Sequence, residues 1–272
     1  MAFEIKNHRL EGVRWSATPN RSSGTITPSL IVVHDTAGRS FDSSLSWMMN
    51  PAAKASAHLL IGRGGEIVQM GAFNQKLWHA GSSRWKGRQY CNGFSVGIEF
   101  DNPGILDRNG RAWFGTTYSD AVPFSTETHG TGAALPYTEA QLETGAEVVL
   151  AIARKYGITD LAAHFEISPG RKFDTTPIFP LEKFRALVTG RDDPEPAEDD
   201  DGFDAVVTIN GLNLRRWPTN NDNVIRGLSA GERLKVIRSG VYAEGFPEAR
   251  WHLVQPESGE PGWVHSAYVR LT

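Results

Sequence analysis

Cysteine is almost absent from this 272-residue chain, since Cys91 is its one thiol. No internal disulfide can form, so core burial must stabilise the fold, and the chain is long enough to supply it. Long apolar runs are also missing. The longest, such as residues 148–153, fall far short of the ~20 residues that cross a bilayer. We therefore expect no membrane insertion.

A basic excess is lacking too, because 28 Lys and Arg face 31 Asp and Glu, for a net charge of −3. This balance predicts no nucleic-acid partner. Residues 1–15 lack the apolar segment of a secretory signal, so we expect a cytoplasmic protein. Action on the outside of the cell would then require release by a holin or a secretion system.

One acidic segment divides the chain. Residues 192–204 hold eight acidic residues and no Lys or Arg, whereas residues 1–191 carry a net +3 and residues 205–272 a net +2. Charge repulsion and two prolines make such a segment a poor core-former and a good extended linker. The pattern predicts two domains, 1–191 and 205–272, joined by an acidic linker.

The first domain alternates strand and helix signals. Residues 29–34 and 94–100 are short apolar runs typical of buried strands, and residues 57–61 and 66–70 flank a glycine-rich turn. Residues 40–50 have a helical pattern. The order of these signals predicts an α/β fold with a mixed central sheet flanked by helices.

The clearest helix signal begins at Thr138, where Thr138 and Gln141 form a capping-box pattern and Gly157 marks the end. A short apolar run at residues 161–163 precedes His164, and a last helix is expected over residues 181–188. Residues 101–137 are rich in Gly, Thr and Pro without a strong period, so we expect an irregular segment that forms one wall of a groove.

Three side chains suit a metal site. His34 and His164 each follow a predicted strand, and Asp174 lies in a loop that contains a Pro-Gly pair. A catalytic metal needs about three protein ligands and an open position. Spacing alone does not select these residues, because the chain has eight scattered histidines.

A family resemblance adds weight to this set. The segments IVVHDTAG, SAHLLIGRGGEIVQM, LWHAG, CNGFSVGIEF, YTEAQ and AHFEISPGRKFDTTP occur in this order between residues 30 and 185. Together they resemble the amidase-2 (N-acetylmuramoyl-L-alanine amidase) family, and within it the type that acts on 1,6-anhydro-muramyl peptides. The resemblance implies Zn²⁺ bound by His34, His164 and Asp174, and a peptidoglycan or muropeptide substrate.

The same resemblance assigns two catalytic roles. Glu99, in GIEF, matches the general base, and Lys172 matches the lysine that stabilises the transition state. Another branch of the family uses a tyrosine at the position of Ala57, so its absence here favours Glu99 as the base. A carboxylate can carry the proton from water to the leaving amine, as this chemistry requires.

Three further residues are expected near the substrate, each with a structural alternative. His79 is interpreted as a groove residue or a structural one, Trp78 as a sugar platform or a core residue, and Arg171 as a partner of peptide carboxylates or a solvated surface charge. His58 lies in an apolar strand and is interpreted as a core histidine.

The second domain reads as all-β. Strand candidates cover residues 206–209, 211–215, 233–237, 251–254 and 262–265, and the segments GLNLRRWP and GWVHSAYV resemble a bacterial SH3-like barrel. The resemblances together predict a zinc amidase of cell-wall recycling or lysis. The alternative is a recognition protein that binds muropeptides without cutting them, and such relatives lack part of the zinc set.

Overall fold

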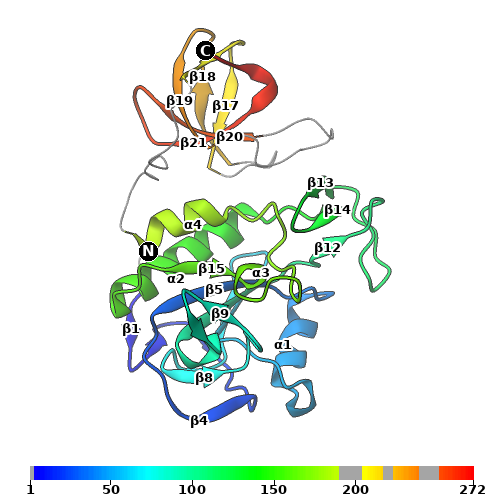
Figure 1. Ribbon diagram of the computed structural model, residues 1–272, viewed down its shortest axis with the longest axis vertical. Coiled ribbons are helices and arrows are strands. Elements are labelled where there is room, and N and C mark those ends of the chain that lie inside the picture. Colours follow the sequence, from blue (N-terminus) through cyan, green and yellow to red (C-terminus); the bar gives the residue numbers. More distant parts are fainter. Residues whose placement is uncertain (1–2, 190–203, 217–222, 239–250) are drawn as a thin grey trace.

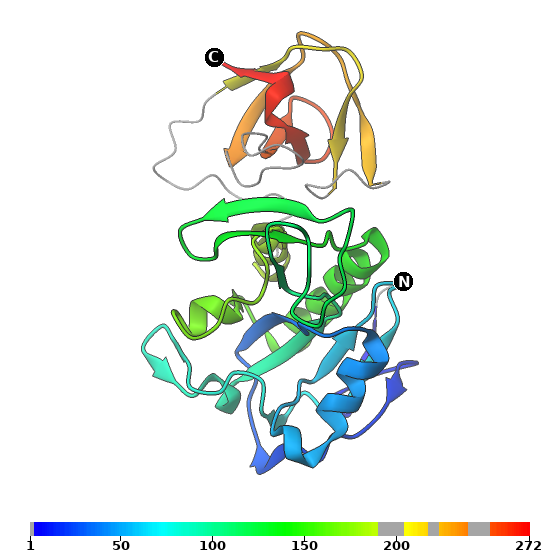
Figure 2. The ribbon, with the colours of Figure 1, turned by 90° about the vertical axis from the view of Figure 1, so that its right-hand side faces the viewer.

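The computed structural model describes residues 3–189, 204–216, 223–238 and 251–272. Its described residues form two bodies, and the second lies beyond the end of the first that carries α4, β13 and β14 (Figures 1 and 2). The predicted linker falls almost wholly outside the described residues. Its last residue, Asp204, is the first residue of strand β16.

A mixed six-stranded sheet forms the centre of the first body, in the order β15-β5-β11-β6-β7-β3. Neighbouring strands are parallel except for the antiparallel pair β6–β7. This confirms the predicted sheet flanked by helices. The strands are β3 (Arg14–Trp15), β5 (Leu30–Asp35), β6 (Leu59–Ile61), β7 (Ile67–Gln69), β11 (Ser95–Phe100) and β15 (Leu161–Ala163).

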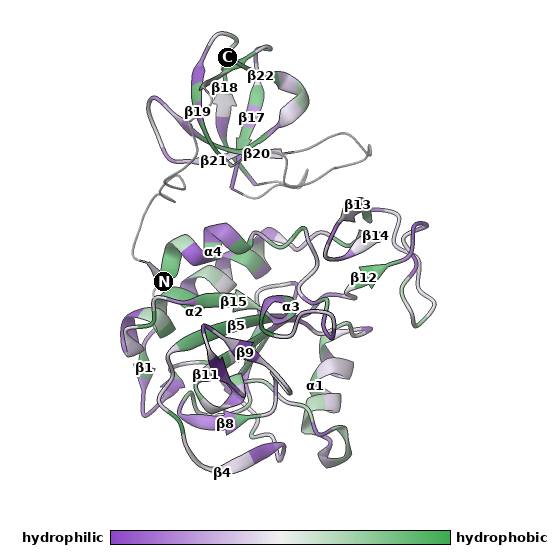
Figure 3. Ribbon diagram, viewed as in Figure 1, coloured by the Kyte–Doolittle hydropathy of each residue, from purple (hydrophilic) through white to green (hydrophobic). Residues whose placement is uncertain are grey.

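Alternation along β5 gives the sheet two different faces. Ile31 and Val33 join the large core cluster that includes residues of α2 and α4, whereas Leu30 and Val32 join a separate cluster on the other side. The edge strand β15 and its neighbour β5 are both strongly hydrophobic (Figure 3). By the two-residue period of a strand, His34 lies on the face of Leu30 and Val32, away from α2.

Three of the helices begin and end close to the predicted residues, whereas the short helix α3 was not predicted. The helices are α1 (Phe41–Met49), α2 (Glu139–Tyr156), α3 (His164–Ile167) and α4 (Leu181–Val188). Thr138 caps α2 by accepting from the Gln141 backbone, and Gly157 ends it in the left-handed conformation. The capping box is only half formed, because the Gln141 amide donates instead to the carbonyls of Ile61 and Asp101 and ties α2 to the sheet.

The expectation of an irregular segment over residues 101–137 is wrong in part. The segment contains a small antiparallel sheet of β12 (Ile105–Leu106), β14 (Gly130–Ala134) and β13 (Val122–Thr126). These strands are too short and too rich in Gly and Ala to show a period in the sequence. Other short strands also escaped prediction: β1 (Ile5–Lys6), β2 (Arg9–Leu10), β4 (Arg21–Thr25), β8 (Gln75–Leu77), β9 (Arg84–Trp85) and β10 (Arg88–Gln89).

The second body contains a seven-stranded antiparallel sheet in the order β18-β17-β21-β20-β19-β16-β22. It surrounds its own apolar cluster, which includes Leu214, Val254 and Val264. The predicted strands are present, while β18 and β22 were missed. The strands are β16 (Asp204–Val207), β17 (Leu212–Arg215), β18 (Val224–Leu228), β19 (Arg233–Arg238), β20 (Trp251–Pro256), β21 (Gly262–His265) and β22 (Val269–Leu271).

Exposed polar side chains join the two bodies. Arg216 pairs with Glu139 and Glu143 on α2, at 3.3 and 2.8 Å, and Lys183 of α4 donates to the Arg216 carbonyl. Exposed ion pairs of this kind contribute little stability. Nowhere in the described ranges does a helix have both the length and the apolar character needed to cross a membrane.

Close packing of α2 on the sheet depends on Gly145. A Cβ there would lie 2.6 Å from the Phe100 ring and 3.3 Å from Phe184. We expect Gly145→Val to lower the free energy of unfolding by about 1–3 kcal/mol through overpacking, as measured by urea denaturation. Gly93→Val is the control, because nothing lies within 4 Å of its Cβ position. Equal stability of the two variants would contradict this account.

Candidate metal centre and active site

The two candidate histidines stand at the same edge of the sheet. His34 is near the end of β5, and His164 follows β15 directly at the start of α3. Because β5 and β15 are parallel neighbours, their carboxyl ends meet at one edge, where sites in open α/β sheets commonly form. The loop after α3 returns Asp174 to this point.

The three side chains are in contact. The Nδ1 atoms of His34 and His164 lie 2.9 Å apart, and Asp174 Oδ2 lies 3.2 Å from the first and 2.8 Å from the second. Among the described residues, this is the one group of three such side chains placed to hold a metal ion. The structure therefore brings together the predicted ligand set.

Hydrogen bonds around His34 assign its protonation. Ser95 Oγ donates to the Cys91 carbonyl at 2.6 Å, so it accepts from His79 Nε2 at 3.2 Å. His79 Nδ1 is then an acceptor for His34 Nε2 at 3.1 Å. His34 consequently keeps a lone pair on Nδ1, the atom that faces His164 and Asp174.

His164 reaches the same state by a separate contact. Its Nε2 lies 3.4 Å from the Ala80 carbonyl, which can only accept, so Nε2 carries hydrogen and the neutral form of the ring has its lone pair on Nδ1. Burial lowers the pKa of His34 to about 4, which favours the neutral ligand form. Two nitrogen lone pairs and a carboxylate oxygen thus converge on one point. This donor set fits a divalent metal, and zinc accepts all three ligand types.

Asp35 holds the loop that carries Asp174. Its Oδ2 accepts from the Thr176 backbone at 2.6 Å, and its Oδ1 accepts from the Tyr137 hydroxyl. Tyr137 also lies 3.0 Å from the Thr176 hydroxyl. Asp35 is buried, and burial raises its pKa to about 7.

A pocket of about 460 Å³ opens over this centre. Its lining contains His164 and Asp174 together with all five of the predicted catalytic and substrate-contacting residues: Trp78, His79, Glu99, Arg171 and Lys172. His34 lies beneath this surface and is only 1% exposed. Side chains as far apart in sequence as Trp78 and Asp174 therefore share one cavity.

Glu99 is placed by strand register. It lies opposite His34 in the parallel pair β11–β5, so both side chains project from the same face of the sheet. Its Oε2 is buried and makes no hydrogen bond with the described residues. Burial, with the nearby Asp174 and Asp35, raises the pKa of Glu99 well above its usual value, while Lys172 opposes this shift.

The three substrate candidates differ in their attachments. The Trp78 indole donates to Ser22 at 2.9 Å and is half-buried. The Arg171 guanidinium donates to the Ala80 carbonyl at 2.8 Å and to Ser168 at 2.7 Å. His79 lines the pocket and also contacts His34, so it is both a groove residue and a structural one. His58 is buried, with Nδ1 accepting from Gly97 and Nε2 facing the Gln75 carbonyl, as expected of a core histidine.

Two residues of the site escaped prediction. Tyr137 gave no local signal, because its partner Asp35 lies 102 positions away. Ser95 was counted only as part of a strand. Gly97 carries a constraint that only the structure reveals, since a Cβ there would lie 2.4 Å from the His79 ring.

The sequence of this chain is similar to those of known amidases. The model of the N-acetylmuramoyl-L-alanine amidase family (Amidase_2) matches residues 24–177. The chain is 34% identical over 181 residues to the 1,6-anhydro-N-acetylmuramyl-L-alanine amidase AmpD of Citrobacter freundii, covering 60% of this chain and 81% of AmpD. It is 29% identical to the N-acetylmuramoyl-L-alanine amidase AmiD of Escherichia coli, over 57% of this chain and 51% of AmiD.

A crystal structure of an AmpD derivative is 31% identical to the chain, with a TM-score of 0.49, and covers 68% of this chain and 99% of AmpD. The family match spans more than half of the 272 residues and includes His34, Glu99 and Asp174. The chain therefore belongs to the N-acetylmuramoyl-L-alanine amidase family of hydrolases.

Proposed function

We propose that this amidase uses zinc to hydrolyse the amide bond between N-acetylmuramic acid and L-alanine in muropeptides, including their 1,6-anhydro forms. The observation that carries the proposal is the convergence of two neutral imidazole lone pairs and a carboxylate on the floor of the pocket, beside an unpaired Glu99 oxygen. The AmpD relatives act on the anhydro-muramyl-L-alanine bond by name, which supports the same bond as substrate here.

His34, His164 and Asp174 would hold the metal. When bound, zinc would supply Lewis-acid activation of water and of the amide carbonyl. The hydrogen bonds from His34 to His79 and from His164 to Ala80 fix both imidazoles in the ligating orientation.

Glu99 is the proposed general base and acid. It takes one proton from the attacking water as the C–O bond forms at the carbonyl carbon, and returns it to the alanine nitrogen as the C–N bond breaks. The products are a free lactyl carboxyl group and a free peptide amine. Its desolvated setting suits this exchange, because a raised pKa brings a carboxylate closer to the working pH.

Lys172 is the proposed partner of the carbonyl oxygen as negative charge develops on it, a contribution of roughly 3–4 kcal/mol for donors of this kind. Arg171 would face stem-peptide carboxylates, and Trp78 and His79 would contact the muramyl end of the substrate. The alternative, a recognition protein that binds without cutting, is less well supported because the whole ligand and catalytic set lies in one pocket or directly beneath it.

Loss of a ligand should remove zinc. We expect the purified protein to hold about one zinc per chain, and His164→Ala and Asp174→Ala to bind little zinc and hydrolyse no muropeptide. Metal content is measured by mass spectrometry, and the matched control is His265→Ala in the second body. Full zinc occupancy in both ligand variants would refute the proposed centre.

Removing the carboxylate of Glu99 should stop proton transfer without removing zinc. We expect Glu99→Gln to lower kcat by roughly 10²–10⁴-fold at unchanged metal content. Because the base must be ionised and burial raises its pKa, wild-type kcat/KM should rise with pH along an acidic limb centred above 4.5. This limb is measured from pH–rate profiles of muropeptide cleavage.

Lys172→Ala provides the contrast to this experiment. It should lower kcat while leaving the acidic limb in place, because the base is intact. An unaltered limb in the residual activity of Glu99→Gln would show that another group is the base.

We also propose the division into an amidase domain, residues 1–191, and an SH3-like domain, residues 205–272, joined by the acidic segment 192–204. Separate apolar clusters in the two bodies support this division. The polar contacts of Arg216 with α2 are of a kind that a truncation can lose at small cost.

If this division is correct, residues 1–191 alone should fold, bind zinc and cleave soluble muropeptide with kcat within about twofold of the full chain. Thermal unfolding and peptide release measured by mass spectrometry check this expectation. A truncated chain that fails to fold would show that the second body is part of one cooperative unit.

A further inference from the structure

Exposed apolar side chains gather at one pocket. In the described residues up to 189, five large hydrophobic side chains are exposed, and three of them, Trp47, Ile105 and Phe173, line the catalytic pocket. A fourth, Trp113, reaches the pocket's rim, because its indole nitrogen donates to the carbonyl of the lining residue Ala37 at 2.8 Å. Single exposed apolar residues need no explanation, but a cluster beside a pocket marks a binding surface.

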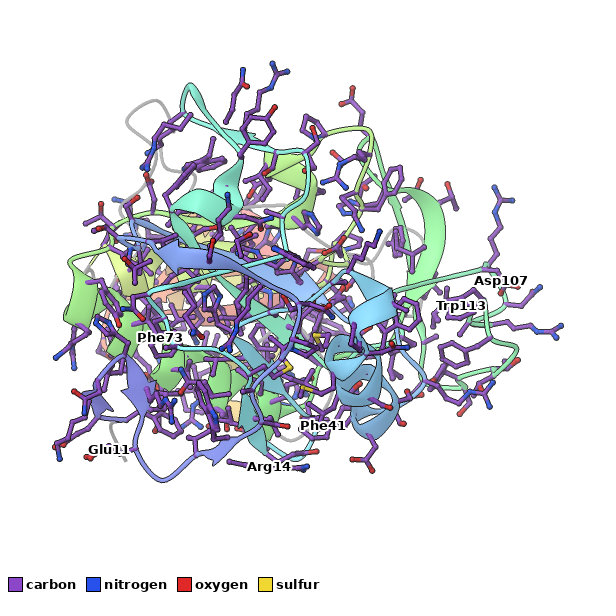
Figure 4. All side chains as sticks on the ribbon, turned by 90° about the horizontal axis from the view of Figure 1, so that it is seen from below. Glu11, Arg14, Phe41, Phe73, Asp107 and Trp113 are labelled. Carbon is purple, nitrogen blue, oxygen red and sulfur yellow. The ribbon has the colours of Figure 1, made fainter. Side chains whose placement is uncertain are left out.

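Trp113 is the most exposed of these side chains, at 78%, yet its orientation is fixed. The hydrogen bond to Ala37 holds one edge of the indole, and Phe114 packs against it edge to face at 5.5 Å. Figure 4 shows Trp113 on the lobe that projects beside α1, with Asp107 farther out. An exposed aromatic ring held in place loses little conformational entropy when it binds a ligand.

The turn that carries Trp113 is itself well ordered by hydrogen bonds. The Asp107 carboxylate accepts from the backbones of Asn109 and Arg111 at 2.8 and 2.9 Å, and Ala112 donates to the Thr116 carbonyl. Arg39 lies over the Phe114 ring and donates to its carbonyl. The lobe therefore presents the Trp113 ring as a fixed platform.

Charge divides the pocket into two walls. The loop after α3 contributes Arg171, which suits the carboxylates of a stem peptide, beside the catalytic candidate Lys172. The wall made by α1 and β12, on the same side of α3 in Figure 1, contributes Trp47 and Ile105, with Trp113 beyond them. This wall suits an uncharged ligand with a flat apolar face, and a pyranose ring presents such a face of C–H groups to an indole.

We propose that Trp47, Ile105 and Trp113 form a glycan-binding subsite that extends the catalytic pocket and binds sugars attached to the muramyl residue being processed. The inference rests on the proposed function, because the scissile amide must sit over the metal centre with its sugar toward this wall. It names polymeric glycan strands bearing stem peptides as the substrate class. The site thus gains affinity with each added sugar that reaches Trp113.

The test measures how the full-length zinc-loaded enzyme cleaves peptidoglycan fragments of one, two and four disaccharide–peptide units. For the wild type, KM per cleavable bond should fall with chain length. Trp113→Ala should raise KM for the four-unit fragment about five- to tenfold at unchanged kcat, and change monomer kinetics less than twofold. Trp113→Phe keeps an aromatic face and should stay within about twofold of the wild type on every fragment, because the flat apolar surface that faces the sugar is retained.

Tyr90→Ala is the matched control. Tyr90 is the fifth of the exposed large hydrophobic side chains described up to residue 189, and it lies on a different loop, away from the catalytic pocket. This variant should leave the dependence on chain length intact. If Trp113→Ala melts well below the wild type, Trp113→Leu replaces it, because leucine keeps apolar bulk in the turn without an aromatic face.

A wild-type KM independent of chain length would overturn the subsite, as would an equal KM for wild type and Trp113→Ala on the four-unit fragment. Failure of the wild type to cleave even the one-unit fragment would instead refute the proposed function. The two failures are therefore distinguishable.

Discussion

Two neutral imidazoles point their lone pairs at each other across 2.9 Å, with a carboxylate oxygen within 3.2 Å of both. Such an arrangement is repulsive unless a cation is shared among the three atoms, and much of the first body holds it in place. Parallel pairing of β5 with β15 fixes the backbones of His34 and His164. The pairing of β11 with β5 places Glu99 on the same face. The placement of the proposed metal ligands at one edge thus follows from strand register.

Support for this edge comes from two directions. Beneath it, a chain of hydrogen bonds runs from the Cys91 carbonyl through Ser95 and His79 to His34. These bonds decide which ring nitrogen of His34 carries hydrogen. Beside it, Asp35 accepts from Thr176 and fixes the loop that delivers Asp174. Both supports are buried, so each hydrogen bond lost would leave an unpaired polar group, which is costly in a region of low dielectric. These contacts make the ligand geometry rigid before any substrate binds.

Local patterns were enough to predict the parts of this structure that depend on local physics. The apolar runs before His34 and His164, and the caps of α2 at Thr138 and Gly157, are visible in the sequence because a strand or a helix end needs those residue types there. The position of Asp174 beside the two histidines could be predicted only from the family resemblance, because the path of its loop is set by Asp35, far away in the chain. The lobe over residues 101–137 escaped prediction because its strands pair with one another and bury few β-branched residues.

That lobe links the metal centre to the pocket wall. At its base, Asn102 donates to the Leu135 carbonyl at 2.9 Å, and Tyr137 bonds to Asp35, which in turn holds the Asp174 loop. Farther along, Ile105 lines the pocket and the lobe's outer turn rests on Ala37, three residues after His34. The same segment therefore braces a ligand loop at one end and shapes the substrate wall at the other. Because both ends are anchored to β5 or the residues that follow it, the position of the wall is tied to the position of the ligands. A substrate bound along that wall, as proposed, would by the same contacts be aligned with the proposed metal centre.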